Sequence, residues 1–89
     1  MAIVIVPPPY RGPTRGEERV EVSGESARAA LLAVNARFPG FGEQIFEPAG
    51  ALHRFVKIFR NGDLLDPSQV DQAIGADDEI EVVTAIAVG

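Results

Sequence analysis

The sequence predicts an α+β fold in which one main helix packs on one face of a mixed sheet of four to five strands. Two observations predict it. The most apolar extended segments lie at the two ends of the chain, residues 2–6 and 78–84, so we expect them to pair in the middle of the sheet. Between them, only residues 27–38 form a long stretch with apolar side chains at helical spacing. The predicted order is strand, strand, helix, strand, short strand, strand.

The chain opens with two predicted strands. Residues 2–6 form a run of mainly β-branched residues, which is typical of a strand covered on both faces. Three prolines at 7–9 end this strand, because proline lacks the amide hydrogen that a sheet ladder needs. After a loop over residues 10–16, the alternation in residues 18–22 predicts a second strand, paired with the first as a hairpin.

Residues 27–38 are predicted to form the main helix. Ser26 is expected to cap its first turn. The stripe that faces the sheet is formed by Ala27, Ala30, Leu31, Val34 and Phe38. A proline–glycine pair at 39–40 ends the helix, since proline disfavours helical geometry at the preceding residue. We expect residues 41–46 to add one further helical turn.

The second half of the chain predicts the remaining strands. Residues 52–60 form the third strand, and Asn61 with Gly62 is a strong hairpin signal that leads to a short strand at 64–65. A helical turn is expected from Asp66 through Ala73. The last strand, residues 78–84, alternates acidic and apolar side chains, as a strand does when one face is buried.

In this order the elements predict a β-grasp, or ubiquitin-like, roll for residues 1–84. Residues 85–89 have no charge, turn residue or polar cap. Because most domains end in a polar or anchored segment, we expect these residues to form an extended C-terminal tail that enters another protein.

Composition restricts the possible function classes. The net charge is −5 and the eight basic residues are scattered, which argues against a nucleic-acid partner or an anionic membrane. The absence of cysteine excludes disulfides, thiolate metal sites and thiol catalysis. No apolar run approaches the roughly 18–20 residues of a membrane span, and residues 2–6 lack the basic flank of a signal peptide. We therefore expect a cytoplasmic protein.

Candidate catalytic groups are sparse. His53 is the only histidine, and no serine, cysteine or carboxylate pair accompanies it at a recognisable spacing. The acidic residues at 77–81 precede and enter a strand, where such side chains are usually solvated, and they lack the spacing of a calcium loop. We expect no catalytic constellation, no metal site and no bound cofactor.

A docking surface is predicted on the third strand. Phe55, Lys57 and Phe59 occupy alternate positions and would share the open face of the sheet, whereas Val56 and Ile58 would face the helix. The full predicted surface comprises Arg54, Phe55, Lys57, Phe59, Arg60 and Val83. Clustered exposed aromatic side chains indicate an interface. The alternative is that the tail or residues 41–46 cover the two phenylalanines.

Motifs along the whole chain point to one family. They are VPPPYR at 6–11, VEV at 20–22, RFPG at 37–40, LHRFVKIF at 52–59, NG at 61–62, DEI at 78–80 and AIA at 85–87. With these motifs the sequence resembles the MoaD/ThiS-type sulfur carriers, especially their CysO-like, actinobacterial-style branch. The resemblance implies a ubiquitin fold and a carrier protein that is not itself an enzyme.

The resemblance also implies the chemistry. A ThiF/MoeB-like adenylating enzyme would use ATP to activate the carboxylate of Gly89, and sulfur would then replace AMP to leave a thiocarboxylate. A cysteine synthase-like or MoaE-like enzyme would accept the sulfur for cysteine or molybdopterin cofactor biosynthesis. The inserted arm would be Ala85, Ile86, Ala87 and Val88. With Gly89 it reaches about 16–18 Å when extended, and glycine has no side chain to obstruct attack on its carbonyl carbon.

Two residues depart from the family pattern. Val88 stands where the family normally has glycine, and its β-branched side chain thickens the arm. Three explanations stay open: a weakened carrier, a carrier with a matched enzyme, or a docking or regulatory domain that has lost the chemistry. A protein modifier attached through Gly89 is a further alternative. Asp77 stands where the family turn has glycine, and aspartate tolerates the left-handed conformation at modest cost.

Overall fold

The computed structural model describes residues 1–6, 12 and 14–84, and every structural statement below refers to these residues. The elements are β1 (Ala2–Ile5), β2 (Arg19–Val22), α1 (Ala27–Arg37), α2 (Phe41–Ile45), β3 (Val56–Arg60), β4 (Asp63–Leu65), a 3₁₀ turn (Pro67–Gln69) and β5 (Glu79–Thr84). None of the described helices is long and apolar enough to cross a membrane.

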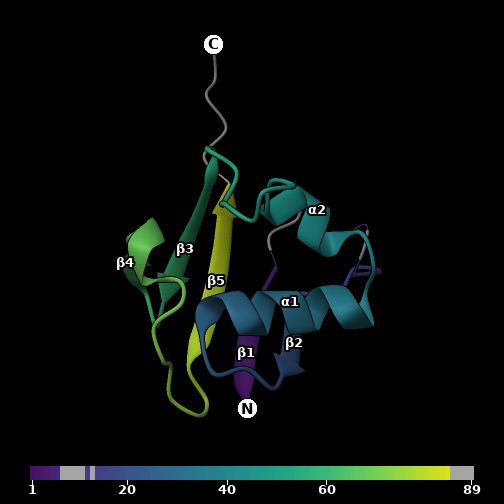
Figure 1. Cartoon of the computed structure of the whole chain (residues 1–89). Helices are drawn as coiled ribbons and strands as arrows, with labels where there is room; N and C mark the ends of the chain where they lie inside the picture. The colour runs from purple at the N-terminus through teal and green to yellow at the C-terminus, as the bar shows by residue number, and fades with distance from the viewer. Residues whose placement is uncertain (7–11, 13, 85–89) are drawn as a thin grey trace.

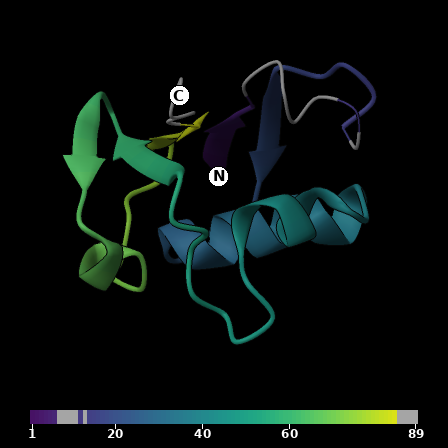
Figure 2. The same cartoon turned by 90° about the horizontal axis from the view of Figure 1, so that it is seen from above.

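The five strands form one mixed sheet in the order β2-β1-β5-β3-β4. β1 runs parallel to β5, with Val4 opposite Ile80, and every other neighbouring pair is antiparallel. The two ends of the chain therefore lie side by side in the interior of the sheet, as predicted (Figure 1). Figure 2 shows the sheet as one layer and the helices α1 and α2 as the second. This confirms the predicted α+β class and the β-grasp arrangement.

The hydrophobic core lies between the two layers. The sheet contributes Val4, Val20, Ile58, Ile80 and Val82, each at most 1% exposed. α1 contributes Ala27, Ala30, Leu31 and Val34, all fully buried. Burial of each of the larger side chains stabilises the fold by about 1.5–3 kcal/mol. The predicted helical stripe is thus confirmed, with Phe38 only partly buried beside it.

The ends of α1 follow from local chemistry. Ser26 accepts a hydrogen bond from the amide of Ala29 at 3.0 Å and so caps the first turn. Gly40 has φ 103°, a conformation that glycine adopts without steric cost, and this turn leads into α2. The amide of Gly42 then donates to Asn35 Oδ1 at 2.9 Å, which joins α2 to α1. The further helical turn predicted at 41–46 is confirmed, ending one residue earlier.

The prediction that the first strand is covered on both faces is wrong. Burial alternates along β1, and Ile3 and Ile5 are only half-buried. Both helices lie on the same side of the sheet, so no described element covers the second face of the strand (Figure 2). A β-branched run indicates a strand but does not show how many of its faces are buried.

Two predicted boundaries are also wrong. β3 begins at Val56, because Leu52 bridges to Phe46 and the amide of Val56 closes a turn on the carbonyl of His53 at 3.0 Å. The helical turn after β4 spans only Pro67–Gln69, and Ala73 instead forms a bridge with Ser26. In both places a bridge to another segment of the chain replaces part of the strand or helical turn that the sequence predicts.

Candidate functional site

The predicted tail residues Ala85, Ile86, Ala87, Val88 and Gly89 lie outside the described residues, so their role stays a prediction. The structure does show Thr84, the residue to which this segment is attached, and we call Thr84 the tail root. β5 ends at Thr84, whose backbone pairs with Val56 at the start of β3. Figure 1 shows this junction at the end of the sheet opposite the N-terminus.

Beside the tail root, part of the predicted docking surface lies on the open face of the sheet. Val56 and Ile58 are buried under the helices, whereas Lys57 is exposed and Phe59 is half-buried on the opposite side. Lys57 pairs with Val83 across β3 and β5, and Phe59 pairs with Glu81. These neighbours bring a lysine stem, a phenylalanine ring and a valine together on one surface. We call Lys57, Phe59 and Val83 the sheet patch.

Phe55 does not belong to β3. It lies with Arg54 in the turn before the strand, and 49% of it is exposed. The guanidinium carbon of Arg54 lies 5.6 Å from the centre of the Phe55 ring, a cation–π contact. Residues 41–46 do not cover this ring, because Phe41 and Ile45 are buried in the core on the helix side. We call Arg54 and Phe55 the turn pair.

Arg60 has a different position from the one predicted. Its Nε donates to Asp78 Oδ2 at 2.9 Å, so its guanidinium is held in an ion pair at the far end of β3. Asp78 also accepts from Asn61 Nδ2 at 3.0 Å and from the Gly75 amide at 2.7 Å. No local pattern in the sequence indicates this ion pair. Arg60 therefore has a structural role in addition to any contact with a partner.

Charge differs between the end of the sheet near the tail root and the rest of β5. Arg54 and Lys57, near the tail root, make no ion pair within the described part of the chain. Glu79 and Glu81 lie further along β5, and Arg19 pairs with Glu79 at 3.1 Å. The end of the sheet that leads to the tail therefore offers apolar area and two cations to a partner, and the remainder of β5 offers carboxylates.

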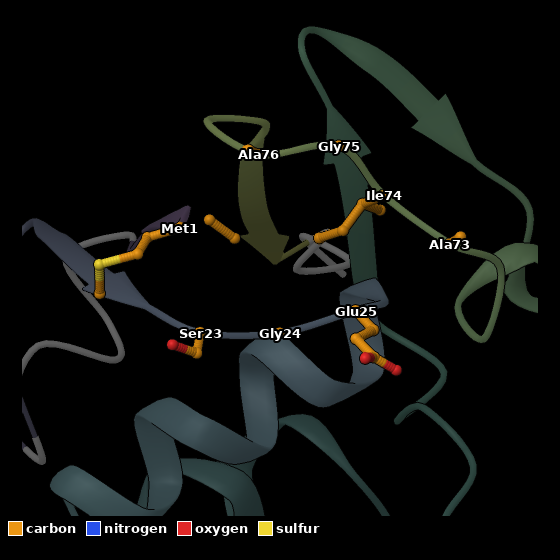
Figure 3. A pocket seen from close by; sticks show the side chains of 9 residues that line it. Met1, Ser23, Gly24, Glu25, Ala73, Ile74, Gly75 and Ala76 are labelled. Atoms are coloured by element: carbon orange, nitrogen blue, oxygen red, sulfur yellow. The ribbon is translucent and has the colours of Figure 1, made fainter.

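At the N-terminal end of the sheet lies a shallow hollow of about 450 Å³ (Figure 3). Its walls are residues 1–2, the β2–α1 connection and residues 73–76. The Ile74 amide donates to the Glu25 carbonyl, and the Asp77 amide donates to the Met1 carbonyl. Glu25 is the only titratable side chain among the residues that line it, so the hollow lacks convergent polar groups. Asp77 has φ 67°, the left-handed conformation expected there.

Other polar groups are dispersed. His53 Nε2 lies 3.0 Å from the carbonyl oxygen of Glu43, a contact between α2 and the connection that follows it. Within residues 1–6, 12 and 14–84, no three His, Cys, Asp or Glu side chains gather closely enough to hold a metal ion. The sheet patch and the turn pair beside the tail root are therefore the strongest candidate site.

This chain is similar to known proteins over nearly its whole length. The model of the ThiS family matches residues 3–89. The sulfur carrier protein CysO of Mycobacterium tuberculosis strain H37Rv is 32% identical over 89 residues, covering 97% of this chain and 96% of CysO.

Solved structures agree with the observed fold. The crystal structure of Mycobacterium tuberculosis CysO has a TM-score of 0.87 at 28% identity and covers 97% of this chain and 100% of that one. The Amycolatopsis orientalis BexX/CysO complex gives a TM-score of 0.90 at 23% identity, with both chains fully covered. SAMP1 from Haloferax volcanii gives 0.78 at 21% identity and covers 99% of this chain and 98% of that one. From the family match and the CysO identity over nearly its whole length, this chain belongs to the ThiS family.

Proposed function

We propose that this protein is a sulfur carrier whose terminal Gly89 is the site of activation. The observation that carries the proposal is that the ThiS family match extends to residue 89 and so includes the terminal glycine. The carboxylate of Gly89 attacks the α-phosphorus of ATP on a ThiF/MoeB-like enzyme and releases pyrophosphate. A sulfur nucleophile then displaces AMP from the acyl adenylate, which leaves a thiocarboxylate. The carrier itself supplies no catalytic group and binds no cofactor.

The candidate site supplies the contact that this reaction needs. A carboxylate on a short arm reacts only when the body of the carrier is docked at a suitable distance from the enzyme. The sheet patch and the turn pair flank the root of the arm, and they provide apolar area together with Arg54 and Lys57. We propose that they dock on an apolar surface bordered by carboxylates at the mouth of the enzyme's channel.

The proposed sulfur acceptor is a cysteine synthase-like enzyme. This choice follows the CysO relative, which matches 97% of this chain at 32% identity. A MoaE-like acceptor in molybdopterin biosynthesis is the alternative. The BexX/CysO structure, in which a similar fold is in complex with another protein, supports docking on a partner protein.

Mass spectrometry tests the carrier function. The purified protein is incubated with a candidate activating enzyme, ATP and a sulfur source, and its intact mass is measured. We expect the mass gain of an oxygen-for-sulfur exchange, located at Gly89 by fragmentation. A variant that lacks Gly89 is the control and should show no gain. If no candidate enzyme yields an adenylate or a thiocarboxylate, while V88G restores both, the protein is a degenerate carrier.

A second candidate function is a docking or regulatory subunit that does not use its terminus. Val88, in place of the usual glycine, favours it. Deleting Val88 and Gly89 separates the two proposals, because partner function that survives the deletion excludes the carrier role. A protein modifier would instead give conjugates of higher mass in lysates of the host.

A further inference from the structure

A second surface lies on the helix side of the molecule, away from the open face of the sheet. It is a groove of about 540 Å³ between α1, α2 and the connection that follows α2. Figure 2 shows this connection extending beyond the helix layer before it returns to β3. Leu32, Phe46 and Pro48 are the large apolar residues that line the groove, and 47% of Leu32 is exposed. We call it the α1–α2 groove.

Hydrogen bonds hold the walls of the groove in place. The amide of Gly42 donates to Asn35 Oδ1 at 2.9 Å, and the amide of His53 donates to the Ile45 carbonyl at 3.0 Å. Behind the groove, the guanidinium of Arg28 lies 5.2 Å from the centre of the Phe46 ring. A groove whose walls are already fixed loses little conformational entropy when a ligand binds.

The groove is acidic. Glu43 and Glu47 line it, both are exposed, and neither carboxylate has an ion pair within the described residues. No lysine or arginine is among the residues that line it. Arg28, which contacts Phe46 from behind, is already bonded to Asp71 at 2.7 Å and to the Gly50 carbonyl at 2.6 Å. Two uncompensated carboxylates therefore flank an apolar floor.

We propose that the α1–α2 groove docks a short segment of a partner protein that carries both apolar and basic side chains. Apolar side chains would cover Leu32 and Phe46, and lysine or arginine would pair with Glu43 and Glu47, which is the charge complementarity seen at protein interfaces. An anionic membrane would be repelled by the same carboxylates. A second copy of this chain, with net charge −5, is likewise disfavoured.

Three labelled peptides test the proposal by fluorescence anisotropy with the full-length protein. The first is an amphipathic peptide of lysine and leucine, the second replaces lysine by glutamate, and the third replaces leucine by serine. We expect measurable binding of the first peptide and at least tenfold weaker binding of the other two, because charge and apolar contact are both required. Equal binding of the lysine–leucine and lysine–serine peptides would show charge attraction alone and overturn the proposal.

Variants locate the binding. The double variant E43Q/E47Q should weaken binding of the lysine–leucine peptide about fivefold, given the modest strength of exposed ion pairs. The matched control E17Q/E21Q removes two exposed carboxylates elsewhere and should leave binding within twofold. L32A should weaken binding severalfold, while L64A, which truncates another exposed leucine, should not. If the control pair weakens binding as much as the groove pair, or if amide NMR shifts cluster on Phe59 and Glu81, the proposal is overturned.

Two further readouts separate other outcomes. Dimerisation in sedimentation experiments that L32A abolishes would show a second copy as the occupant and overturn the proposal. Thiocarboxylate formation by E43Q/E47Q should equal that of the unmodified protein, because none of the residues that line the groove belongs to the sheet patch or the turn pair. Binding of the peptide does not depend on Gly89, so the groove can be confirmed even if the carrier function fails.

Discussion

Asp78 is a single side chain that joins three parts of the chain. Its carboxylate accepts hydrogen bonds from Arg60, Asn61 and the Gly75 amide, at distances of 2.7–3.0 Å. These bonds, led by that from the Asn61 side chain, lower the pKa of Asp78 below its ordinary value. The charged form is thus favoured by the fold, which ties the start of β5 to the β3–β4 turn.

The lowered pKa predicts how stability depends on pH at this residue. Because the folded-state pKa lies below the ordinary value of 3.8, the contribution of Asp78 is present above that value and is lost as pH falls through the folded-state pKa. We expect D78N to unfold at lower urea concentration at pH 7 and to lose less stability than the unmodified protein between neutral and acidic pH.

Urea titrations at a series of pH values measure both effects. D63N is the control, because Asp63 is exposed and makes no ion pair within the described structure. Asp66, whose pKa is lowered by hydrogen bonds from Ser68, keeps part of the acid sensitivity in D78N. Identical pH profiles for D78N and the unmodified protein would contradict the assignment.

Gln44 presents the opposite case. Its Oε1 is buried and has no hydrogen-bond partner in the described structure. An unsatisfied buried acceptor costs roughly 1–3 kcal/mol, so replacing it by an apolar side chain of similar shape is favourable. We expect Q44M to raise the free energy of unfolding by about 1 kcal/mol, measured by urea denaturation. A decrease in the free energy of unfolding would show that the Gln44 amide group stabilises the fold by more than the burial of its Oε1 destabilises it.

At the scale of elements, the β2–α1 connection depends on one close approach. A Cβ added at Gly24 would lie 2.6 Å from the backbone nitrogen of Ala30, so the connection could not keep its place against α1. Backbone atoms cannot move aside as a flexible side chain can. Gly24 is thus required by packing rather than by a left-handed conformation.

We expect G24A to lower the free energy of unfolding by about 1–3 kcal/mol, the range for overpacked sites. G12A is the matched control, because a Cβ at Gly12 would meet nothing within 4 Å. Its stability should be unchanged or slightly higher, since alanine restricts the unfolded chain. Thermal melts of both variants measure the difference. Equal melting temperatures for G24A and the unmodified protein would show that the connection shifts freely.

At the scale of the whole molecule, the fold separates two surfaces. The sheet patch lies on the open side, the turn pair lies in the turn that leads into β3, and the α1–α2 groove lies on the helix side. Their charges also differ, with Arg54 and Lys57 on the first and Glu43 and Glu47 on the second. The two proposed docking surfaces therefore differ in the sign of their charge.

This division predicts the effect of charge reversal on activation. K57E should raise the KM of the activating enzyme for the carrier about three- to tenfold, as expected for one exposed charge at an interface, and should leave kcat nearly unchanged. R37E reverses a charge at the end of α1, on the other side of the molecule, and should leave KM within twofold. Steady-state adenylation kinetics compare the two variants. An equal effect of both would show long-range attraction instead of docking at the sheet patch.

The sequence predicted less of the candidate site than of the fold. The alternation in β3 correctly separated Val56 and Ile58 from Lys57 and Phe59, because strand side chains alternate between faces. It did not show that Phe55 lies in a turn before the strand or that Arg60 is bound to Asp78. The Arg60–Asp78 ion pair joins two separate segments of the chain, and the turn at Phe55 follows the bridge between Phe46 and Leu52, so neither can be read from the alternation within the strand.

Periodicity, capping and turn residues by themselves determined which elements form and how the two ends of the chain pair. The apolar spacing of α1, the Ser26 cap and the Asn61–Gly62 turn are local features, so their physical chemistry can be inferred from neighbouring residues. Only the tertiary structure decided that one face of the sheet stays open, that Asp78 gathers its donors, and that α2 packs beside α1 to leave the acidic groove. These features arise because folding brings separate segments into contact, and the resulting burial and charge belong to no single segment.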